Sequence, residues 1–264
     1  MKKFMHKIIS TMLNIMMTLK RYHRVKRKGI NYILDLKEVV DRAVFLRGWE
    51  PSTISYLQKN LNPEDIVIEV GSNIGAHSLI ISKLVGPNGH LHAFEPTDFA
   101  FNKLSANYML NPEFVKNTSL HKKYVSNKQL AQVPKIRSSW QIDKTLETEE
   151  MMDEDMTEEI ITLDEFFKDL DRLDFIKIDI DGFDYKALSG GENLIKKFRP
   201  KVFIELGEYH LNLNGDSCED ILDFLKNYNY EGVLDTGEAI VNADHVKEIL
   251  NKQSHINALF TQKI

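Results

Sequence analysis

Short apolar runs rich in β-branched residues recur along this chain and are separated by segments with helical spacing. The strand-like runs lie at 66–70, 90–94, 175–178, 202–206, 230–234 and 255–260. Helical spacing predicts helices near 76–84, 98–110, 185–198 and 218–228, several of them closed by Gly or Pro. Strands that alternate with helices over 264 residues predict one large α/β domain with an extension.

The pattern is less decisive elsewhere. Residues 30–45 predict short strands or a hairpin, and 119–125 predict a third, weak strand. Short helices are expected near 52–60 and 162–167, whereas 244–250 fits either a helix or a loop. The acidic stretch at 136–159 indicates a solvated surface or a docking partner for the basic N-terminal segment.

Residues 65–95 contain the strongest local signal. An apolar strand is followed by the turn Gly71-Ser72-Asn73-Ile74-Gly75, a helix, a second strand and then Glu95-Pro96. Strand, glycine turn, helix, strand and acid form a nucleotide-binding βαβ unit. The glycines let the backbone approach a ligand, and the acid after the second strand accepts hydrogen bonds from ribose hydroxyls.

The residue types in this turn limit the class of ligand that it can bind. A dinucleotide fingerprint reads G-x-G-x-x-G, whereas here Asn73 occupies the middle position and Glu69 precedes the loop. A carboxylate there repels a pyrophosphate and suits a cationic ligand, such as the amino group of a methionine moiety. Gly71 is expected to need a positive φ or a side that carries no Cβ. A nicotinamide oxidoreductase with a degenerate fingerprint remains the alternative.

A second group of acids follows two later strands. Asp179 and Asp181 come directly after the run at 175–178, and Glu205 lies at the end of the run at 202–206. Ligands of open α/β sheets bind beyond the carboxyl ends of the strands, so these acids are expected in the same crevice as Gly71 and Glu95. Carboxylates there can accept a proton or bind Mg²⁺.

Three separated motifs carry a family resemblance. The segments EVGSNIG, IKIDIDGFDYKALSGGENLI and RPKVFIELGEYH, which occur in this order between residues 66 and 210, resemble the FkbM family of class I S-adenosylmethionine-dependent methyltransferases. The resemblance implies a three-layer α-β-α Rossmann-like fold, with a mostly parallel seven-stranded sheet and an antiparallel C-terminal edge strand. It also implies S-adenosyl-L-methionine as the cofactor and O-methylation of a sugar or polyketide hydroxyl.

The resemblance and the motifs together suggest a set of site residues. The donor site is expected to comprise Glu69, Gly71, Ser72, Asn73, Gly75, Glu95, Pro96, Ser126, Asn127 and Asp179. Asp179 and Asp181 are expected where the methyl group meets the acceptor, and the general base is sought among Asp181, Glu205, Glu208 and His210, between which the sequence does not choose. No residue is assigned to a metal. Segments before the core cover the active site in the resembled family, so residues 49–52 are candidates for ligand contact.

The N-terminal segment differs in character from the rest. Residues 1–28 contain nine lysines and arginines and no acid, and apolar positions 5, 8, 9, 12, 13 and 16 share one helical face. This predicts a basic amphipathic helix that docks on the catalytic domain or a second subunit, or lies on an anionic membrane surface. The predicted division is a helix and cap segment at 1–60 and a methyltransferase domain at 61–264.

Composition limits the partners. A net charge of −5 argues against a nucleic-acid acceptor, which leaves a small molecule or a glycan. Cys218 is the single cysteine, which favours a reducing, cytoplasmic location. Association with the inner surface of the membrane is the alternative location. The alternative to an enzyme is an adaptor protein that keeps the methyltransferase fold without catalysis.

Overall fold

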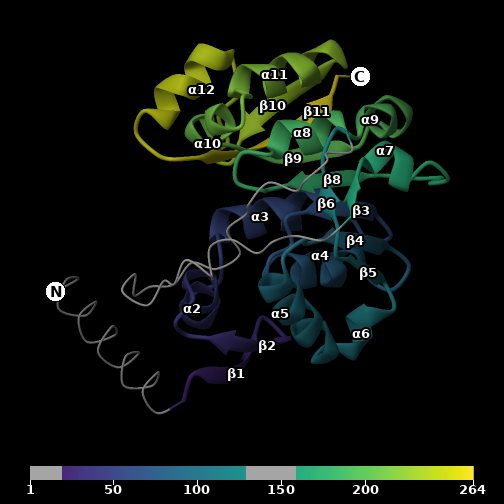
Figure 1. Ribbon diagram of the computed structural model, residues 1–264, viewed down its shortest axis with the longest axis vertical. Helices are drawn as coiled ribbons and strands as arrows, with labels where there is room; N and C mark the ends of the chain where they lie inside the picture. Colours follow the sequence, from purple (N-terminus) through teal and green to yellow (C-terminus); the bar gives the residue numbers. More distant parts are fainter. Residues whose placement is uncertain (1–19, 129–158, 264) are drawn as a thin grey trace.

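Strands and helices alternate along the protein in a computed structural model that describes residues 20–128 and 159–263 (Figure 1). The strands are β1 (Tyr22–Arg27), β2 (Ile30–Asp35), β3 (Ile66–Val70), β4 (His90–Phe94), β5 (Thr118–His121), β6 (Tyr124–Val125), β7 (Ile160–Ile161), β8 (Phe175–Ile178), β9 (Lys201–Leu206), β10 (Tyr230–Leu234) and β11 (Ile256–Gln262). The helices are α2 (Val39–Leu46), α3 (Pro51–Asn60), α4 (Ser78–Val85), α5 (Asp98–Met109), α6 (Pro112–Val115), α7 (Leu163–Phe166), α8 (Asp184–Ser189), α9 (Glu192–Phe198), α10 (Glu208–Leu213), α11 (Cys218–Asn227) and α12 (Ala243–Leu250).

Within the described residues, seven strands form one sheet in the order β10-β11-β9-β8-β3-β4-β5. The pairs among β9, β8, β3, β4 and β5 are parallel, and β11 runs antiparallel to both β9 and β10. The predicted seven-stranded, mostly parallel Rossmann-like sheet is confirmed. Its antiparallel strand β11 lies one place in from the edge, which β10 occupies.

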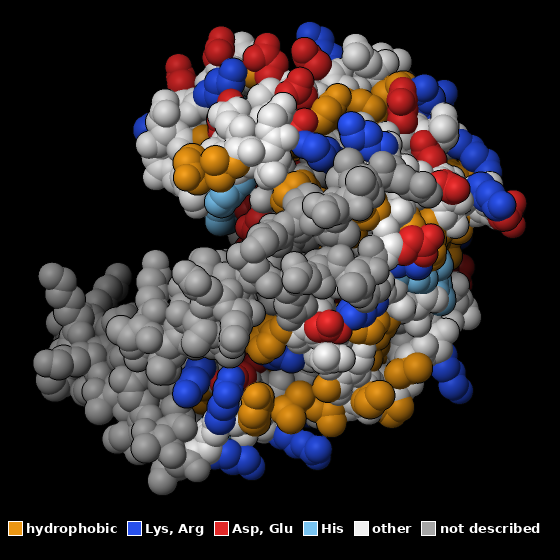
Figure 2. All heavy atoms as spheres, viewed as in Figure 1, with side chains coloured by type: hydrophobic (Ala, Val, Ile, Leu, Met, Phe, Trp, Pro, Cys, Tyr) orange, Lys and Arg blue, Asp and Glu red, His pale blue; other side chains and the backbone are white. Residues whose placement is uncertain are grey.

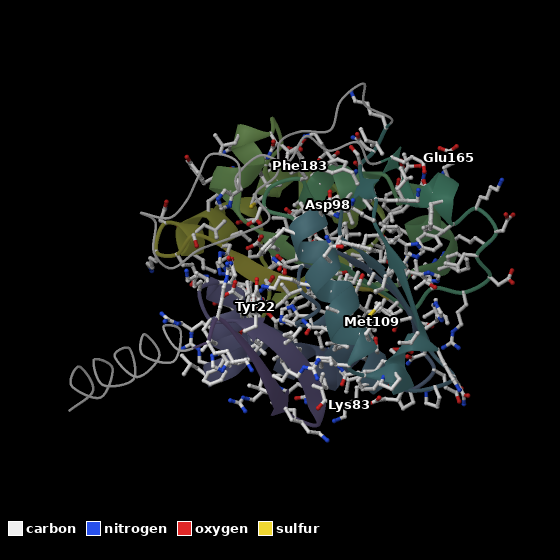
Figure 3. All side chains as sticks on the ribbon, turned by 60° about the horizontal axis from the view of Figure 1, so that its bottom comes forward. Tyr22, Lys83, Asp98, Met109, Glu165 and Phe183 are labelled. Carbon is white, nitrogen blue, oxygen red and sulfur yellow. The ribbon has the colours of Figure 1, made fainter. Side chains whose placement is uncertain are left out.

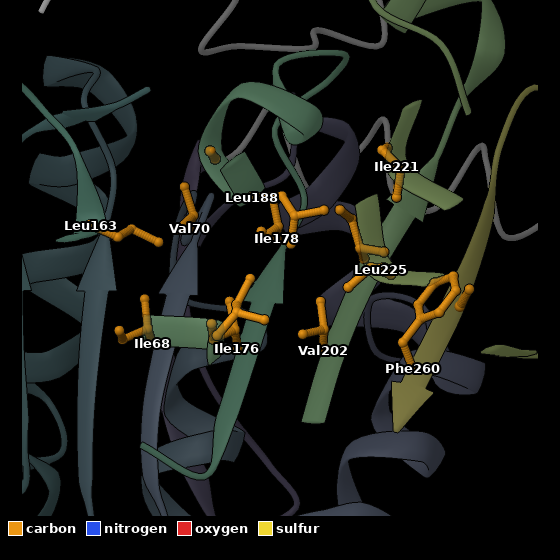
Figure 4. Close-up of a cluster of buried hydrophobic side chains, with 14 of the residues drawn as sticks. Ile68, Val70, Leu163, Ile176, Ile178, Leu188, Val202, Ile221, Leu225 and Phe260 are labelled. Carbon is orange, nitrogen blue, oxygen red and sulfur yellow. The ribbon is translucent and has the colours of Figure 1, made fainter. Parts of the chain in front are cut away.

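Each face of the sheet is covered by its own helices. On one face, α8, α9, α11 and α12 pack on alternate apolar residues of the strands, including Ile68, Ile176 and Val202 (Figure 4). On the other face, α3 and α4 pack on Val67, Phe175 and other residues that point the opposite way. Because side chains alternate along a strand, every strand of the sheet centre contributes to both cores. The three-layer arrangement follows from this alternation.

The N-terminal part of the described chain is a hairpin. Strands β1 and β2 pair antiparallel from Tyr22 to Asp35, and the turn between them is Lys28-Gly29, both with positive φ. A two-residue turn of this kind matches the right-handed twist of a hairpin. The prediction of a helix through residue 28 is therefore wrong at residues 22–27, where polar and half-buried positions alternate. The helical face predicted from positions 5–16 lies outside the described residues.

The hairpin packs next to the glycine turn. Its apolar face joins residues of α4 and α5 in one buried cluster. Asn107 of α5, fully buried, accepts a hydrogen bond from the Ile33 backbone N–H at 2.8 Å and donates to the Ile74 carbonyl at 2.9 Å. One amide side chain thus ties the hairpin to the loop after β3.

Several local predictions need correction. The strand expected near residues 39–46 is helix α2, because Val40 and Val44 lie one turn apart and are both buried. The single strand expected at 119–125 is divided into β5 and β6, and β6 pairs with β7 outside the main sheet. The single helix expected at 185–198 is two helices. Gly190 separates them, and a Cβ there would lie 2.1 Å from the Ser126 carbonyl oxygen.

Two surface features bear on the predicted partners. Within residues 20–128 and 159–263, every helix is too short or too polar to cross a bilayer. Lys and Arg side chains gather at the bottom of the molecule in Figure 2, around the hairpin, where Arg24, Lys26, Arg27 and Lys28 are exposed.

Candidate active site

The carboxyl ends of β3, β4, β8 and β9 line two neighbouring pockets. The first pocket runs over the ends of β3 and β4 and is lined by Val70, Gly71, Asn73, Phe94, Glu95, Pro96, Ala100, Lys123, Tyr124, Val125, Asp179, Ile180, Asp181 and Phe183. The second pocket lies under the segment that joins α2 to α3 and is lined by Val39, Val40, Trp49, Glu50, Gly71, Ser72, Asn73, Ala76, His77, Asp179, Asp181, Glu205 and His255. Gly71, Asn73, Asp179 and Asp181 belong to both, so the two pockets meet at these residues.

The first pocket lies towards the N-terminal end of α5. Figure 3 labels Asp98 at this end of the helix and Met109 at the other. Ala100, in the first turn of α5, and Phe183 both line the first pocket. The pocket therefore lies at the end of the sheet where the glycine loop, α5 and the loop after β8 converge.

The loop after β3 is fastened to the end of β4. The backbone N–H of Asn73, a residue with φ 47°, donates to Glu95 Oε2 at 2.9 Å. The other carboxylate oxygen of Glu95 accepts the Thr97 backbone N–H at 3.0 Å and the Thr97 hydroxyl at 2.5 Å. Since a left-handed conformation suits Asn better than most residues, Asn73 fits this place. Glu95 is thereby held in one orientation at the rim of the first pocket.

Gly71 permits a close approach between two strand ends. It has φ 92°, and a Cβ on it would lie 1.9 Å from the Asp179 carbonyl oxygen and 2.8 Å from Ile180 Cγ2. The predicted positive φ is confirmed. The backbone after β8, however, is the neighbour that excludes a side chain here. A glycine is therefore required at position 71 for the close packing of the ends of β3 and β8, as well as for the shape of the pocket.

A buried charged row crosses the sheet below the loop. Glu69 of β3 and Lys177 of β8 are direct partners in the parallel register, and Lys177 Nζ lies 3.6 Å from Glu69 Oε1 and 2.9 Å from Asp179 Oδ2. Ser72 and Ser78 donate their hydroxyls to Glu69 Oε2. Glu69 is 0% exposed and Lys177 is 1% exposed. Such charges are tolerated in a core only when they are paired.

The pairing is visible in the pKa values. Burial alone would lower the pKa of Lys177, but the carboxylates of Asp179 and Glu69 outweigh it and raise this pKa. Burial would raise the pKa of Asp179, yet the Lys177 ammonium lowers it below its ordinary value. Burial raises the pKa of Glu69, despite the opposing effect of Lys177. Lys177 therefore stays charged and keeps Asp179 ionised.

The turn after β8 has its own support. Asp181 and Gly182 both adopt positive φ, and Asp184 accepts the backbone N–H groups of Ile180 at 3.1 Å and Gly182 at 2.9 Å. Asp184 is 2% exposed, and burial together with the nearby Asp179 raises its pKa to about 7. This carboxylate holds the turn that directs Asp179 and Asp181 towards the two pockets.

The second pocket is lined by two further acidic residues and two histidines. Burial and the charge of Asp179 raise the pKa of Glu50 to about 7. Burial, with Asp179 next, also raises the pKa of Glu205, whose Oε1 lies 3.4 Å from His255 Nδ1. His77 is 4% exposed, and burial followed by the charge of Lys177 lowers its pKa to about 3. At neutral pH this imidazole is therefore uncharged.

Some predicted site residues lie in the pockets and others beside them. Those that line a pocket are Gly71, Ser72, Asn73, Glu95, Pro96, Asp179, Asp181 and Glu205. Glu69 lies beneath the loop, and Gly75 packs against Leu104. Ser126 is buried and Asn127 exposed, and the pocket is lined instead by Lys123, Tyr124 and Val125, which precede them.

Two of the candidate bases have structural contacts away from the pockets. Glu208 accepts the backbone N–H of Cys218 at 2.8 Å, at the start of α11. The carbonyl of His210 lies where a Cβ on Gly182 would fall, which places this part of α10 against the turn after β8. Neither residue is among those that line the two pockets.

Sequence reasoning missed His77, Lys177 and His255. Lys177 left a signal, because a lysine inside an otherwise apolar four-residue strand requires a buried partner. The sequence around His77 and His255 gives no such indication, since His77 precedes a helix and His255 a strand with no unusual residue pattern. Of residues 49–52, which were candidates for ligand contact, Trp49 and Glu50 line the second pocket.

The comparisons with known proteins agree with this geometry. A scan against protein-family models matches residues 69–231, more than half of the chain, to the Methyltransferase FkbM domain. A search of curated proteins found no match.

One solved structure shows the same fold, and two others are more distant. An FkbM methyltransferase from Methylobacillus flagellatus KT is 19% identical with a TM-score of 0.50, and the alignment covers 81% of this chain and 48% of that one. The chain thus spans about half the length of that protein. A SAM-dependent O-methyltransferase from Thermotoga maritima is 10% identical with a TM-score of 0.46, with coverage of 92% and 78%. An rRNA methylase from Streptococcus thermophilus is 11% identical with a TM-score of 0.46, with coverage of 80% and 95%.

The strand order, the glycine loop and the acid after β4 have the Rossmann-like arrangement of a class I methyltransferase fold. The chain belongs to the FkbM methyltransferase family, since the match to that domain covers more than half of the chain. The match includes the glycine loop after β3 and the acids at the ends of β8 and β9.

Proposed function

We propose that the protein transfers the methyl group of S-adenosylmethionine to a hydroxyl of a carbohydrate or a polyketide-like small molecule. The observation that carries this proposal is the second pocket, which meets the first at Gly71, Asn73, Asp179 and Asp181. Two pockets that share one wall can hold a donor and an acceptor in contact. Holding two reactants in near-attack geometry is the main task of such an enzyme.

The residues of the first pocket fit the donor. Gly71 leaves room where a side chain would collide, and Glu95 presents a fixed carboxylate at the end of β4 for ribose hydroxyls. Tyr124, Val125 and Phe183 supply apolar surface for a base. The donor supplies an electrophilic methyl group on a sulfonium. The carboxylates of Asp179 and Asp181 supply negative charge where the two pockets meet.

The second pocket suits a hydroxylated acceptor. Carboxylates accept hydrogen bonds from hydroxyl groups, and the Trp49 indole offers an apolar face for a sugar ring. Asp179 already accepts a hydrogen bond from Lys177, so we assign the acceptor proton to Asp181 or Glu205. An acceptor with many phosphates would be repelled by this set of acids.

The acceptor proposal is tested by methyl transfer. The purified protein is incubated with methyl-labelled S-adenosylmethionine and matched panels of neutral oligosaccharides, hydroxylated macrolactones, amines and RNA. We expect label in methyl ethers of the neutral hydroxylated compounds. Label confined to amines or RNA would contradict O-methylation, while transfer abolished in a Gly71→Ala protein shown by circular dichroism to be folded would tie the activity to this site.

Donor binding makes a separate prediction. Glu95→Ala is expected to weaken S-adenosylmethionine binding by about 1.5–3 kcal/mol, the usual value of hydrogen bonds to a charged group. Isothermal titration calorimetry measures this directly. Glu113→Ala, at an exposed position in α6, is the control and should bind as the wild type does. Unchanged affinity in a folded Glu95→Ala protein would remove Glu95 from the donor site.

A further inference from the structure

Three side chains from separate parts of the chain converge in the second pocket. Glu50 precedes α3, His77 precedes α4, and Asp179 follows β8. Each offers one oxygen or nitrogen atom, and these atoms all lie within 4.8 Å of one another. Among the described residues, no other set of three acidic, histidine or cysteine side chains comes together in this way. The set Asp179, Asp181 and Glu205, considered for Mg²⁺ from the sequence, is therefore not so arranged.

The histidine of this cluster is oriented like a ligand. The His77 ring forms a hydrogen bond with the Trp49 backbone, which partly offsets the lowering of its pKa by burial. Nε2 is buried, 3.9 Å from Glu50 Oε2, and has no hydrogen-bond partner among the described residues. A ring held by one nitrogen, with the lone pair of the other directed at two carboxylates, is the usual arrangement of metal-binding histidine.

The positive charges around Glu50 and Asp179 do not balance the negative charge of these carboxylates. Lys177 is the buried cation of this region, and it is shared between Asp179 and Glu69. Glu50 is oriented by Thr53, whose hydroxyl donates to Oε2 at 3.1 Å, and its backbone adopts a left-handed φ of 40°. A strained backbone that aims a half-buried acid at another acid costs free energy unless a cation binds between them.

We propose that Glu50, His77 and Asp179 bind one divalent first-row transition ion, such as Mn²⁺ or Zn²⁺. One imidazole nitrogen with two carboxylate oxygens favours these ions over Mg²⁺ and Ca²⁺, which prefer oxygen ligands alone. Three protein ligands leave coordination positions open, and the cluster lines the second pocket. A hydroxyl oxygen of the acceptor would occupy such a position and lose its proton more readily. That role rests on the proposed function, whereas ion binding does not.

The main competing role for His77 is general base catalysis. A general base must contact the acceptor, whereas His77 is 4% exposed and its Nε2 lies 3.9 Å from Glu50 Oε2. The same position suits a ligand, because a metal ion between these side chains would bind the unprotonated imidazole. The competing occupant of the cluster is the α-ammonium of the donor, which also carries positive charge.

The test uses the full chain after treatment with a chelator. Titration with MnCl2 and with ZnCl2, followed by calorimetry and by electron paramagnetic resonance of Mn²⁺, should show one ion per chain. His77→Gln and Glu50→Gln should each weaken binding about 100-fold or more, because loss of even a residue that only supports a ligand costs about 10–100-fold. His90→Gln is the matched control: this half-buried histidine bonds to Ser119, away from the cluster, and the variant should bind as the wild type does.

Three outcomes would overturn the proposal. The first is absence of saturable binding of either ion to the chelator-treated protein. The second is unchanged binding in both His77→Gln and Glu50→Gln, with folding verified by circular dichroism. The third is displacement of the ion by saturating S-adenosylhomocysteine, which would assign the cluster to the donor's ammonium. Failure of methyl transfer with normal ion binding would instead count against the proposed function.

Discussion

Replacing Gly71 by alanine is expected to lower the free energy of unfolding by about 3 kcal/mol or more and to abolish donor binding. The added Cβ would lie 1.9 Å from the Asp179 carbonyl oxygen, so the ends of β3 and β8 must separate. Overpacking of this kind costs about 1–3 kcal/mol, and a left-handed alanine adds about 1–2 kcal/mol. Donor binding is lost because Gly71 and Asp179 line both pockets and would both move. Urea unfolding and calorimetry with S-adenosylmethionine measure the two effects.

Gly86→Ala separates the steric effect from the backbone effect. Gly86 also has a positive φ, 69°, but no atom lies within 4 Å of its added Cβ. With ψ at −174°, this backbone conformation is one that residues other than glycine rarely adopt, so the variant should lose about 1–3 kcal/mol from the backbone alone and keep normal donor affinity. Equal losses in the two variants would mean that the approach of Asp179 to Gly71 is not the reason for this glycine.

Replacing Lys177 by methionine is expected to destabilise the protein by about 3–5 kcal/mol. Methionine fills a similar volume, so the loss measures charge more than packing. Without the ammonium, Glu69 is left with no exposed surface and no cation, and Asp179 loses a hydrogen bond of 2.9 Å. Removing one partner of a buried ion pair costs this much because the remaining charge stays buried. Thermal and urea unfolding give the change in stability.

Two further variants test the reason for this loss. Lys201→Met affects a half-buried lysine on the neighbouring strand β9, whose ammonium donates to the Asn60 carbonyl, and should cost about 0.5–1.5 kcal/mol. Adding Glu69→Gln to Lys177→Met should restore part of the stability, because the uncompensated buried carboxylate is removed. A single Lys177→Met variant as stable as Lys201→Met would show that the charge row contributes little.

The fold could be predicted in outline because its signals are local. The apolar runs and helical spacings come from hydrophobic periodicity, and the turn after β3 is marked by Gly71 and Gly75. Errors occurred where tertiary contacts overrode local pattern. Residues 22–27 pair with β2 as a strand, although the preceding basic segment suggested a helix. Between α8 and α9, the Ser126 backbone occupies the space that a side chain at Gly190 would need.

The sequence by itself determined the chemistry available at the strand ends: a glycine turn between Glu69 and Glu95, and acids after β8 and β9. Those choices are encoded locally, since strand ends and turns are set by neighbouring residues. Only the tertiary structure decided which groups meet. Parallel register places Lys177 opposite Glu69, and the packing of α3 and α4 on one face of the sheet brings Glu50 and His77 to Asp179. Contacts between residues 50, 77 and 179 leave no trace in sequence spacing, because they depend on how separate elements pack on the sheet.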